Sequence, residues 1–384
     1  MFWIACIFMG LIFIYRPLGD TSMDASVYVE RIEAGYANTD NSLSDVIESA
    51  YSTGSTTPDI YERILVYLVS RFTGNGHIFF AIGAMIFGFF YSRNLWYIFD
   101  RLPAKVGFYI GISIIFFMYI NPMHTVGGIR MNTALHVFAY GAMPFILEKD
   151  KSKTIWCLLA PLFHFSFIAA TAMFLVYLLL PKRDTIILPL FILYIITFFI
   201  NSLNLESVNM FLKQYTTQEI LESKIDGYAN TNAAISRMEH FKEYNAFIQF
   251  MRSYSKYLVF FIMLSCSYCW LKVRTKATTR LFAFSLLFFS FANIASSIPS
   301  GSRFINIGLM FLTPLYIFNM VIIKTNLYNK LKYCALLWIP SIVLAIRIDF
   351  GSFGITALVT NFLTTPFFET DVPLIVFVKQ LLYV

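Results

Sequence analysis

The chain has 384 residues, of which 58% are hydrophobic and only 13% are charged, and its mean hydropathy is +0.66. A soluble globular domain carries about 25% charged residues and about 45–50% apolar ones, so this composition excludes a soluble enzyme. The apolar residues fall in blocks of about 15–25 separated by short charged clusters, which is typical of repeated membrane crossings. The sequence therefore predicts an all-α polytopic integral membrane protein, with a single transmembrane domain over residues 1–384.

Apolar runs mark the predicted membrane-spanning helices. The run 154–180 is too long for one helix of ordinary length, and Pro161 and His164 interrupt it. We therefore expect two short crossings that turn near His164. This interpretation gives about twelve crossings, with both termini on the same side. The runs are, in chain order, 2–15, 77–98, 104–121, 131–147, 154–180, 184–203, 257–273, 281–298, 303–323, 333–349 and 372–384.

Lysine and arginine indicate the orientation, because they collect in cytoplasmic loops. With the N-terminus inside, the inner loops hold dense basic clusters at 149–153, 182–183 and 272–280. A single helix over 154–180 would move 182–183 to the outside, which favours the two-crossing interpretation. We predict that both termini are cytoplasmic. The net charge of +7 then reflects orientation and does not indicate a nucleic-acid partner.

Two long segments, 16–60 and 204–256, fall on the predicted outer side. The first is acidic, and the second contains helix-like stretches whose apolar positions share one stripe. Such amphipathic helices lie on a membrane surface, and we expect them to cover the site. The segment 59–72 (DIYERILVYLVSRF) is too short and too charged to span a bilayer, so we expect an interfacial or re-entrant helix.

Motifs for cofactor or metal chemistry are missing from the sequence. It contains no Walker A loop, no GxGxxG loop and no HExxH helix. Cys266 and Cys269 form a CxxC, but no second pair or nearby histidine completes a zinc site, so we interpret them as buried helix residues. We expect a metal-independent activity without a cofactor.

Isolated polar residues at the outer ends of predicted helices form the candidate site. Arg130 and Arg303 follow glycine-containing turns (GGIR and SGSR), and His164 lies at a predicted turn. Ionisable groups in membrane segments are usually paired or functional. Each has an alternative: an arginine at a helix end can reach lipid headgroups, and a histidine can be a hydrogen-bonded structural residue. We prefer the structural interpretation for His136 and expect His77 to be solvated.

Two arginines and a histidine suit a lipid pyrophosphate substrate. Guanidinium groups bind pyrophosphate bidentately and stay charged, and a histidine can accept a proton from a hydroxyl nucleophile. Acidic residues of the first outer loop could instead bind sugar hydroxyls or serve as the base. The candidate catalytic residues are His164, Arg130 and Arg303, and the candidate substrate-binding residues are Asp20, Asp24, Tyr61 and Glu62.

The order of these features resembles a known family. An early acidic loop (GDTSMDASVY) precedes the tyrosine–glutamate segment DIYERILVYLVSRF. The helix start GGIRMNTALHVFAYG, the segment FHFSFIAA and the late arginine of SGSRFINIGLMF follow in that order. This arrangement resembles the EpsG-type branch of the Wzy polymerases, which make O-antigen, capsule or exopolysaccharide.

The resemblance implies a membrane glycosyltransferase. It would polymerise undecaprenyl-pyrophosphate-linked oligosaccharide repeat units on the outer face of the bacterial inner membrane. The implied fold is a GT-C-like, O-antigen ligase-like plan with 204–256 as the large outer loop, and a chain-length regulator is a candidate partner. The resemblance points to Arg130, His164 and Arg303, and also to Asp24 and Glu62. An O-antigen ligase-like transferase, a lipid-linked oligosaccharide flippase and a membrane acyltransferase remain alternatives.

Overall fold

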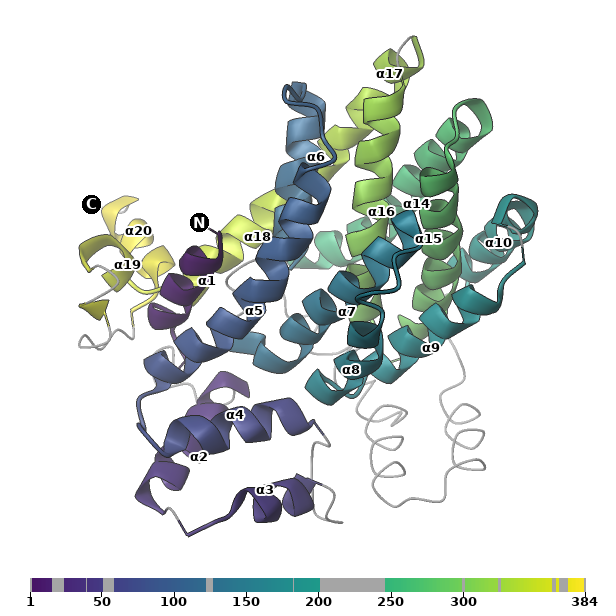
Figure 1. The fold of residues 1–384 in the computed structure, drawn as a ribbon. Helices are drawn as coiled ribbons and strands as arrows, with labels where there is room; N and C mark the ends of the chain where they lie inside the picture. Colours follow the sequence, from purple (N-terminus) through teal and green to yellow (C-terminus); the bar gives the residue numbers. More distant parts are fainter. Residues whose placement is uncertain are drawn as a thin grey trace.

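The protein is helical throughout the part that the structure describes (Figure 1). This computed structural model describes residues 2–15, 24–38, 40–50, 59–121, 127–181, 183–200, 246–298, 301–323, 326–360, 364–365 and 372–382. Within these ranges the extended pairing is limited to isolated β-bridges, Phe13 with Phe353 and Gly354 with Pro373. The predicted all-α class is confirmed for these residues.

Most of the helices follow the predicted apolar runs in order, and the others lie between these runs. Their bounds are α1 Phe2–Leu11, α2 Asp24–Ala37, α3 Leu43–Ala50, α4 Ile60–Ser70, α5 Gly76–Phe99, α6 Phe108–Tyr119, α7 Ile129–Glu148, α8 Ile155–Phe163, α9 Phe167–Leu179, α10 Arg183–Phe198, α14 Ala246–Lys272, α15 Lys276–Ala295, α16 Arg303–Ile322, α17 Asn326–Leu331, the 3₁₀ helix η3 Lys332–Trp338, α18 Ile339–Ser352, α19 Thr356–Val359 and α20 Leu374–Leu382.

Four helical segments of the described chain are long and apolar enough to cross a membrane. They are Gly76–Phe99, Lys276–Ala295, Arg303–Ile322 and Leu327–Ser352, the last of which runs through α17, η3 and α18. Several other apolar helices are shorter, such as Phe2–Leu11 and Phe108–Tyr119. These helices are consistent with a membrane protein, and the number of about twelve crossings stays a prediction.

Local sequence explains where the helices begin. The side chain of Asn75 accepts the backbone N–H groups of His77 and Ile78 and so caps the start of α5. At the start of α15, Thr275 and Thr278 form a reciprocal capping box. Such caps satisfy backbone donors that have no partner within the helix.

The chain breaks at His164, as Pro161 and the length of the run predicted. Helix α8 ends at Phe163, and α9 begins at Phe167. The nine residues of α8 rise only about 14 Å at 1.5 Å per residue, against a hydrocarbon core of about 30 Å. Helix α8 by itself is therefore too short to span the hydrocarbon core.

Contacts at the far end of α9 establish that the chain turns back at this break. The Tyr177 hydroxyl, near the end of α9, donates to the backbone oxygen of Arg280 in the first turns of α15 (3.3 Å). Arg280 in turn donates to the backbone oxygens of Ile146 and Leu147, at the end of α7. Because α8 follows α7 after a short loop, the start of α8 and the end of α9 lie at the same end of the bundle.

Helix α14 begins earlier than the sequence predicted. The stretch 246–256 was expected in the outer segment 204–256, but it is the first part of a 27-residue helix, Ala246–Lys272. Once a helix has formed, each further residue adds one backbone hydrogen bond, so polar residues such as Gln249 do not end it. The rest of the predicted outer segment, 204–245, lies outside the described residues.

Helices α2, α3 and α4 gather at one end of the bundle, below α5 in Figure 1. They come from the segment 16–60 and from 59–72, which the sequence predicted as an acidic outer loop and a short interfacial helix. Helix α4 has eleven residues, too few to span the hydrocarbon core. These three helices bring acidic side chains against the starts of longer helices.

Candidate functional site

Arg130 anchors the site at the start of α7. Its Nε donates to the Tyr28 hydroxyl (2.8 Å), its Nη1 to Asp59 Oδ2 (3.0 Å) and its Nη2 to Asp24 Oδ2 (3.4 Å). Tyr28 and Asp24 lie one turn apart on α2, whereas Asp59 directly precedes α4. One guanidinium group thus joins α7 to both of the helices that cover it.

The two carboxylates around Arg130 differ in environment. The Asp59 side chain is 3% exposed and that of Asp24 is 75% exposed. A buried ion pair loses most of its hydration, whereas an exposed pair remains solvated and contributes little to stability. Asp59 is therefore the structural partner of Arg130, and Asp24 is the carboxylate that solvent or a substrate can reach.

Asp59 also holds the turn between α8 and α9. Its Oδ1 accepts the backbone N–H of Phe165 at 2.7 Å, while its Oδ2 accepts from Arg130. Phe165 directly follows His164. A single buried carboxylate therefore fixes the start of α7 relative to the turn that carries the candidate histidine.

His164 lies between Ser166 and Arg303. Its Nδ1 is 2.8 Å from Ser166 Oγ and accepts the backbone N–H of Ser166 at 3.2 Å, and its Nε2 is 3.4 Å from Arg303 Nη1. A backbone N–H and a guanidinium N–H can each only donate, so a neutral ring satisfies one of these two contacts at a time. In the Nδ1–H tautomer, Nε2 accepts from Arg303. In the Nε2–H tautomer, Nδ1 accepts from Ser166, the ring and the Arg303 guanidinium are both donors, and an anionic oxygen between them would satisfy both.

The turn before Arg303 requires a glycine. A Cβ atom at Gly301 would overlap the backbone carbonyl of Ala295, at the end of α15. This close approach lets the chain reverse within a few residues and begin α16 at Arg303. The half-buried Arg303 is therefore placed by the backbone of the SGSR turn.

The structure brings three of the predicted catalytic residues into one chain of contacts. Arg130 reaches Asp59, Asp59 reaches the backbone beside His164, and His164 reaches Arg303. Residues that are far apart in the sequence, on three different stretches of chain, thus meet at one end of the bundle.

The predicted substrate-binding residues are placed differently from one another. Asp24 contacts Arg130, as described, whereas Glu62 is fully buried and accepts from Arg31 at 3.0 and 3.2 Å. The Tyr61 ring packs against Phe163, with 4.6 Å between centroids. Asp20 lies outside the described residues.

The Tyr28 hydroxyl, which accepts a hydrogen bond from Arg130, is buried. The pKa of Tyr28 is raised above its ordinary value, mainly because the phenol is buried, and nearby Asp24 and Glu62 add to this effect. Tyr28 therefore stays a neutral hydroxyl at physiological pH and acts as a hydrogen-bond acceptor for Arg130 Nε. It adds no charge to the site.

Sequence reasoning missed Asp59, Tyr28 and Arg31 as members of this cluster. Asp59 was grouped with the other acids of the first outer segment, although it stands at the head of DIYERILVYLVSRF. An acid that directly precedes an apolar helix, close to Glu62, was the available signal. Nothing in the sequence indicated that Arg31 would bind Glu62.

The two other histidines of the described residues, His77 and His136, have structural positions. His136 Nε2 is 3.4 Å from the backbone oxygen of Asn121, and the amide of Asn94 is 3.3 Å from its Nδ1, which fits the structural interpretation. The expectation for His77 was wrong: it is 6% exposed, and its ring packs on Tyr15 at 4.9 Å. It is buried because the start of α5 packs against the segment after α1.

No group of three or more His, Cys, Asp or Glu residues that could hold a metal ion occurs among the described residues.

No curated protein and no solved structure matches the chain. A model of the EpsG family, however, matches residues 1–355 and so covers most of the sequence. This match suggests a polysaccharide polymerase-like function in a membrane, with a lipid-linked sugar as substrate. The chain belongs to the EpsG family.

Proposed function

We propose that this protein is a membrane glycosyltransferase that polymerises oligosaccharide repeat units linked to undecaprenyl pyrophosphate. The reaction would take place on the outer face of the bacterial inner membrane and extend a surface polysaccharide. Family membership supports the reaction class. The observation that carries the proposal is the contact between His164 Nε2 and Arg303 Nη1, 3.4 Å apart at the end of the bundle where Arg130 also lies.

Arg303 and His164 would hold the donor pyrophosphate. In the reaction, an acceptor hydroxyl attacks the anomeric carbon of the donor sugar, and the bond from that carbon to the pyrophosphate oxygen breaks. Negative charge grows on the departing oxygens, and donors that are already oriented toward them stabilise it. Arginine suits this role because it stays charged and presents its N–H groups in a planar fork.

Asp24 is the candidate for the proton of the acceptor hydroxyl. His164 was expected to take this proton, but in this scheme its Nδ1 accepts the N–H of Ser166 and its Nε2 carries a proton that it donates to the pyrophosphate. Asp24 is 75% exposed and is held at 3.4 Å by Arg130 Nη2, so its carboxylate can reach a substrate. Arg130 and Asp59 would be positioning residues in this scheme.

The same proposal covers the orientation and the fold plan. Cytoplasmic termini place α2–α4, Arg130, His164 and Arg303 on the outer side, where lipid-linked repeat units would be joined. We retain the GT-C-like plan with a large outer loop before α14 as part of this proposal, together with a single transmembrane domain. A chain-length regulator is a candidate partner.

A reconstituted reaction tests the function. Purified protein is incubated with an undecaprenyl-pyrophosphate-linked repeat unit, without nucleotide or added metal, and the products are separated by size. We expect a ladder of multimers on one lipid carrier. For Arg303→Ala we expect a rate about 10²–10³-fold lower, as for loss of one donor to a developing oxyanion.

Arg274→Ala is the control, because Arg274 is an exposed arginine just before α15 and its guanidinium lies over the Trp270 ring. It should make the wild-type ladder. A single addition to a different acceptor would indicate a ligase-like transferase instead. Movement of the unchanged substrate across a proteoliposome membrane would indicate a flippase, and a normal ladder from Arg303→Ala would refute the role of Arg303.

A further inference from the structure

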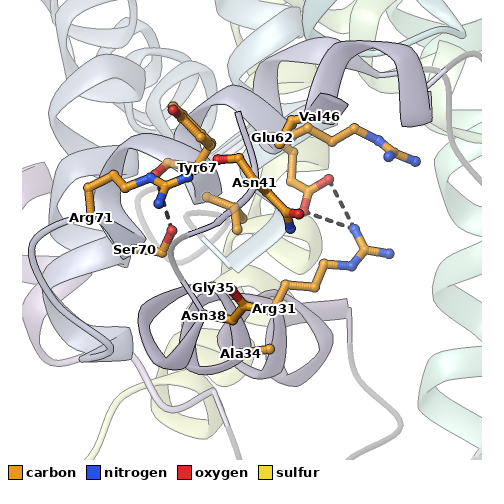
Figure 2. A pocket seen from close by; sticks show the side chains of 12 residues that line it. Arg31, Ala34, Gly35, Asn38, Asn41, Val46, Glu62, Tyr67, Ser70 and Arg71 are labelled. Carbon is orange, nitrogen blue, oxygen red and sulfur yellow. Dashed lines mark hydrogen bonds and ion pairs between the residues drawn. The ribbon is translucent and has the colours of Figure 1, made fainter. Parts of the chain in front are cut away.

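The His164 ring differs from the ion pairs near the site, because its hydrogen bonds can run in two directions. In an ion pair the direction is fixed, as where Arg31 donates to both carboxylate oxygens of Glu62 (Figure 2). The buried ring of His164 instead meets donors on two sides. The backbone N–H of Ser166 is 3.2 Å from Nδ1, and Arg303 Nη1 is 3.4 Å from Nε2. A neutral imidazole has a single acceptor nitrogen, so it can accept from only one of these two donors at a time.

The hydroxyl group of Ser166 suits both tautomers of the ring. Its Oγ is 2.8 Å from His164 Nδ1, and a hydroxyl can either donate or accept. When Nδ1 carries a proton, Oγ accepts the N–H, and when Nδ1 carries a lone pair, Oγ donates to it. Serine often caps a helix, but the Ser166 side chain makes no capping hydrogen bond at the start of α9. The hydroxyl therefore serves the ring and not the helix backbone.

In the absence of an anion, the contacts favour the tautomer with the proton on Nδ1. In this form the ring donates to Ser166 Oγ, and Nε2 accepts a charge-assisted hydrogen bond from Arg303, which is the stronger kind of bond. The ring then accepts nothing from the backbone N–H of Ser166. With the proton on Nε2, a ring N–H would instead face a guanidinium N–H at 3.4 Å, and two donors that face one another repel.

An anionic oxygen between Nε2 and Arg303 reverses this preference. Arg303 then donates to the anion, and an unprotonated Nε2 would turn its lone pair toward negative charge. A protonated Nε2 donates to the same oxygen, while Nδ1 accepts from the backbone N–H and the hydroxyl of Ser166. Ser166 and Arg303 are half-buried, so water reaches the site and can carry the proton.

We propose that Ser166 is a positioning residue that lets His164 exchange tautomers when an anion binds beside Arg303. One proton leaves Nδ1 for water, another passes from water to Nε2, and the ring is neutral before and after the exchange. In the empty site His164 accepts from Arg303, and the pair of donors forms only when the pyrophosphate is present. The inference rests on the proposed function for the identity of that anion.

NMR of the histidine rings tests the exchange without polymerisation. The full-length protein, with ¹⁵N-labelled histidines, is placed in lipid nanodiscs at about pH 8, where histidine is ordinarily neutral. Spectra are recorded with and without inorganic pyrophosphate. The couplings to the ring C–H protons show which nitrogen carries the proton, and the signal that is missing from His164→Gln identifies the residue. We expect the Nδ1–H tautomer without pyrophosphate and the Nε2–H tautomer with it.

Substitutions of Ser166 separate its hydroxyl from its backbone. Ser166→Ala removes the acceptor for Nδ1–H but keeps the backbone N–H that donates to an unprotonated Nδ1. Without pyrophosphate, the ratio of Nε2–H to Nδ1–H should therefore rise by about tenfold. Ser166→Thr keeps a hydroxyl and should restore the wild-type ratio. Ser302→Ala is the matched control, because Ser302 also directly precedes a helix of the site, α16, without a side-chain capping bond, and it should behave as wild type.

The affinity for pyrophosphate gives a second measurement. In the wild type, part of the binding free energy is used to change the tautomer, whereas Ser166→Ala already populates the tautomer that binds. This variant should therefore bind pyrophosphate as tightly as the wild type or up to about tenfold more tightly. A hydroxyl that contacted the anion directly would give the opposite result, because its removal would weaken binding.

Three results would overturn the inference. They are the same tautomer with and without pyrophosphate, an unchanged tautomer ratio in Ser166→Ala, and weaker binding of pyrophosphate by that variant. A wild-type protein that exchanges tautomers but makes no ladder from the lipid-linked repeat unit would refute the proposed function and leave the exchange standing. A normal ladder from a protein with one fixed tautomer would refute the exchange and leave the proposed function standing.

Discussion

At the scale of single residues, the site depends on which oxygen or nitrogen each polar group faces. Asp59 and Asp24 both contact Arg130, yet only Asp59 is buried and also accepts the N–H of Phe165. His164 contacts Ser166 through Nδ1 and Arg303 through Nε2. These details separate residues that maintain the fold from those that can act on a substrate.

Asp59→Asn should destabilise the protein, whereas Asp24→Asn should not. Asparagine at 59 keeps an oxygen for Phe165 but removes the charge beside Arg130, and breaking a buried ion pair costs about 3–5 kcal/mol. Loss of the exposed Asp24 charge should cost less than about 1 kcal/mol. Unfolding of the two variants in detergent checks this, and equal losses of stability would contradict the distinction.

Substitutions of His164 should show whether its side chain acts as a hydrogen-bond donor or as a general base. Glutamine can place an N–H group near the position of Nε2 but cannot accept a proton, so His164→Gln should retain part of the activity. His164→Ala should lose about 10²–10³-fold. The rate of ladder formation is measured for both. If His164→Gln is as inactive as His164→Ala, histidine is the general base and the Nε2–H tautomer proposed for it is wrong.

At the scale of helices, close approach decides how the short elements are held. Helix α1 has only ten residues and crosses α5 at Gly10, where a Cβ atom would lie 2.5 Å from the Phe80 backbone oxygen and 2.8 Å from the Ala81 Cα. Aromatic contacts extend the packing, such as Phe13 with Phe80 at 5.0 Å between centroids. The helix depends on α5 for its position.

Gly10→Ala should therefore push α1 away from α5 and destabilise the protein. Overpacking of a tight contact typically costs about 1–3 kcal/mol. Gly111→Ala in α6 is the matched control, because nothing lies within 4 Å of a Cβ there. That variant should be neutral or slightly stabilised, since alanine favours a helix more than glycine does. Identical melting temperatures for the two variants would argue against the close α1–α5 packing.

At the scale of the molecule, the basic loops and the candidate site lie at opposite ends of the helical bundle. The contacts among Tyr177, Arg280 and Ile146 gather the basic loops 149–153 and 272–276 at one end. The candidate site lies at the other end, with Arg130, Arg303 and the α8–α9 turn that carries His164. The positive-inside rule applied to this arrangement predicts that the candidate site lies outside.

Cysteine labelling in intact cells tests that orientation. In a variant without the half-exposed Cys334, Ser44→Cys in α3 should react with a membrane-impermeant maleimide, while Ser152→Cys should not. Pro181→Cys, after α9, should also remain unlabelled, because the chain returns inside at that point. The other native cysteines of the chain are buried. The reverse pattern would place the candidate site in the cytoplasm and exclude polymerisation on the outer face.

The sequence predicted the parts of the site that depend on local patterns, but it did not predict the contacts that join distant segments. Arg130, His164 and Arg303 stand out because polar residues are rare in apolar runs and each follows a break in a helix. Their mutual contacts could not be inferred, because these depend on Asp59, which looked like one acid among many. Glu62 was selected as a sugar ligand, but its buried pairing with Arg31 depends on how α2 packs against α4.

The sequence by itself determined the membrane class, the order of the helices, the break at His164 and the family. These follow from composition, from local hydrophobicity and from short motifs, all of which act along the chain. Only the tertiary structure decided that a buried carboxylate links α7 to the α8–α9 turn, that His164 contacts Arg303, and that the buried Glu62 pairs with Arg31. Burial and hydrogen-bond direction depend on atoms brought together from distant segments, so no local pattern in the sequence specifies them.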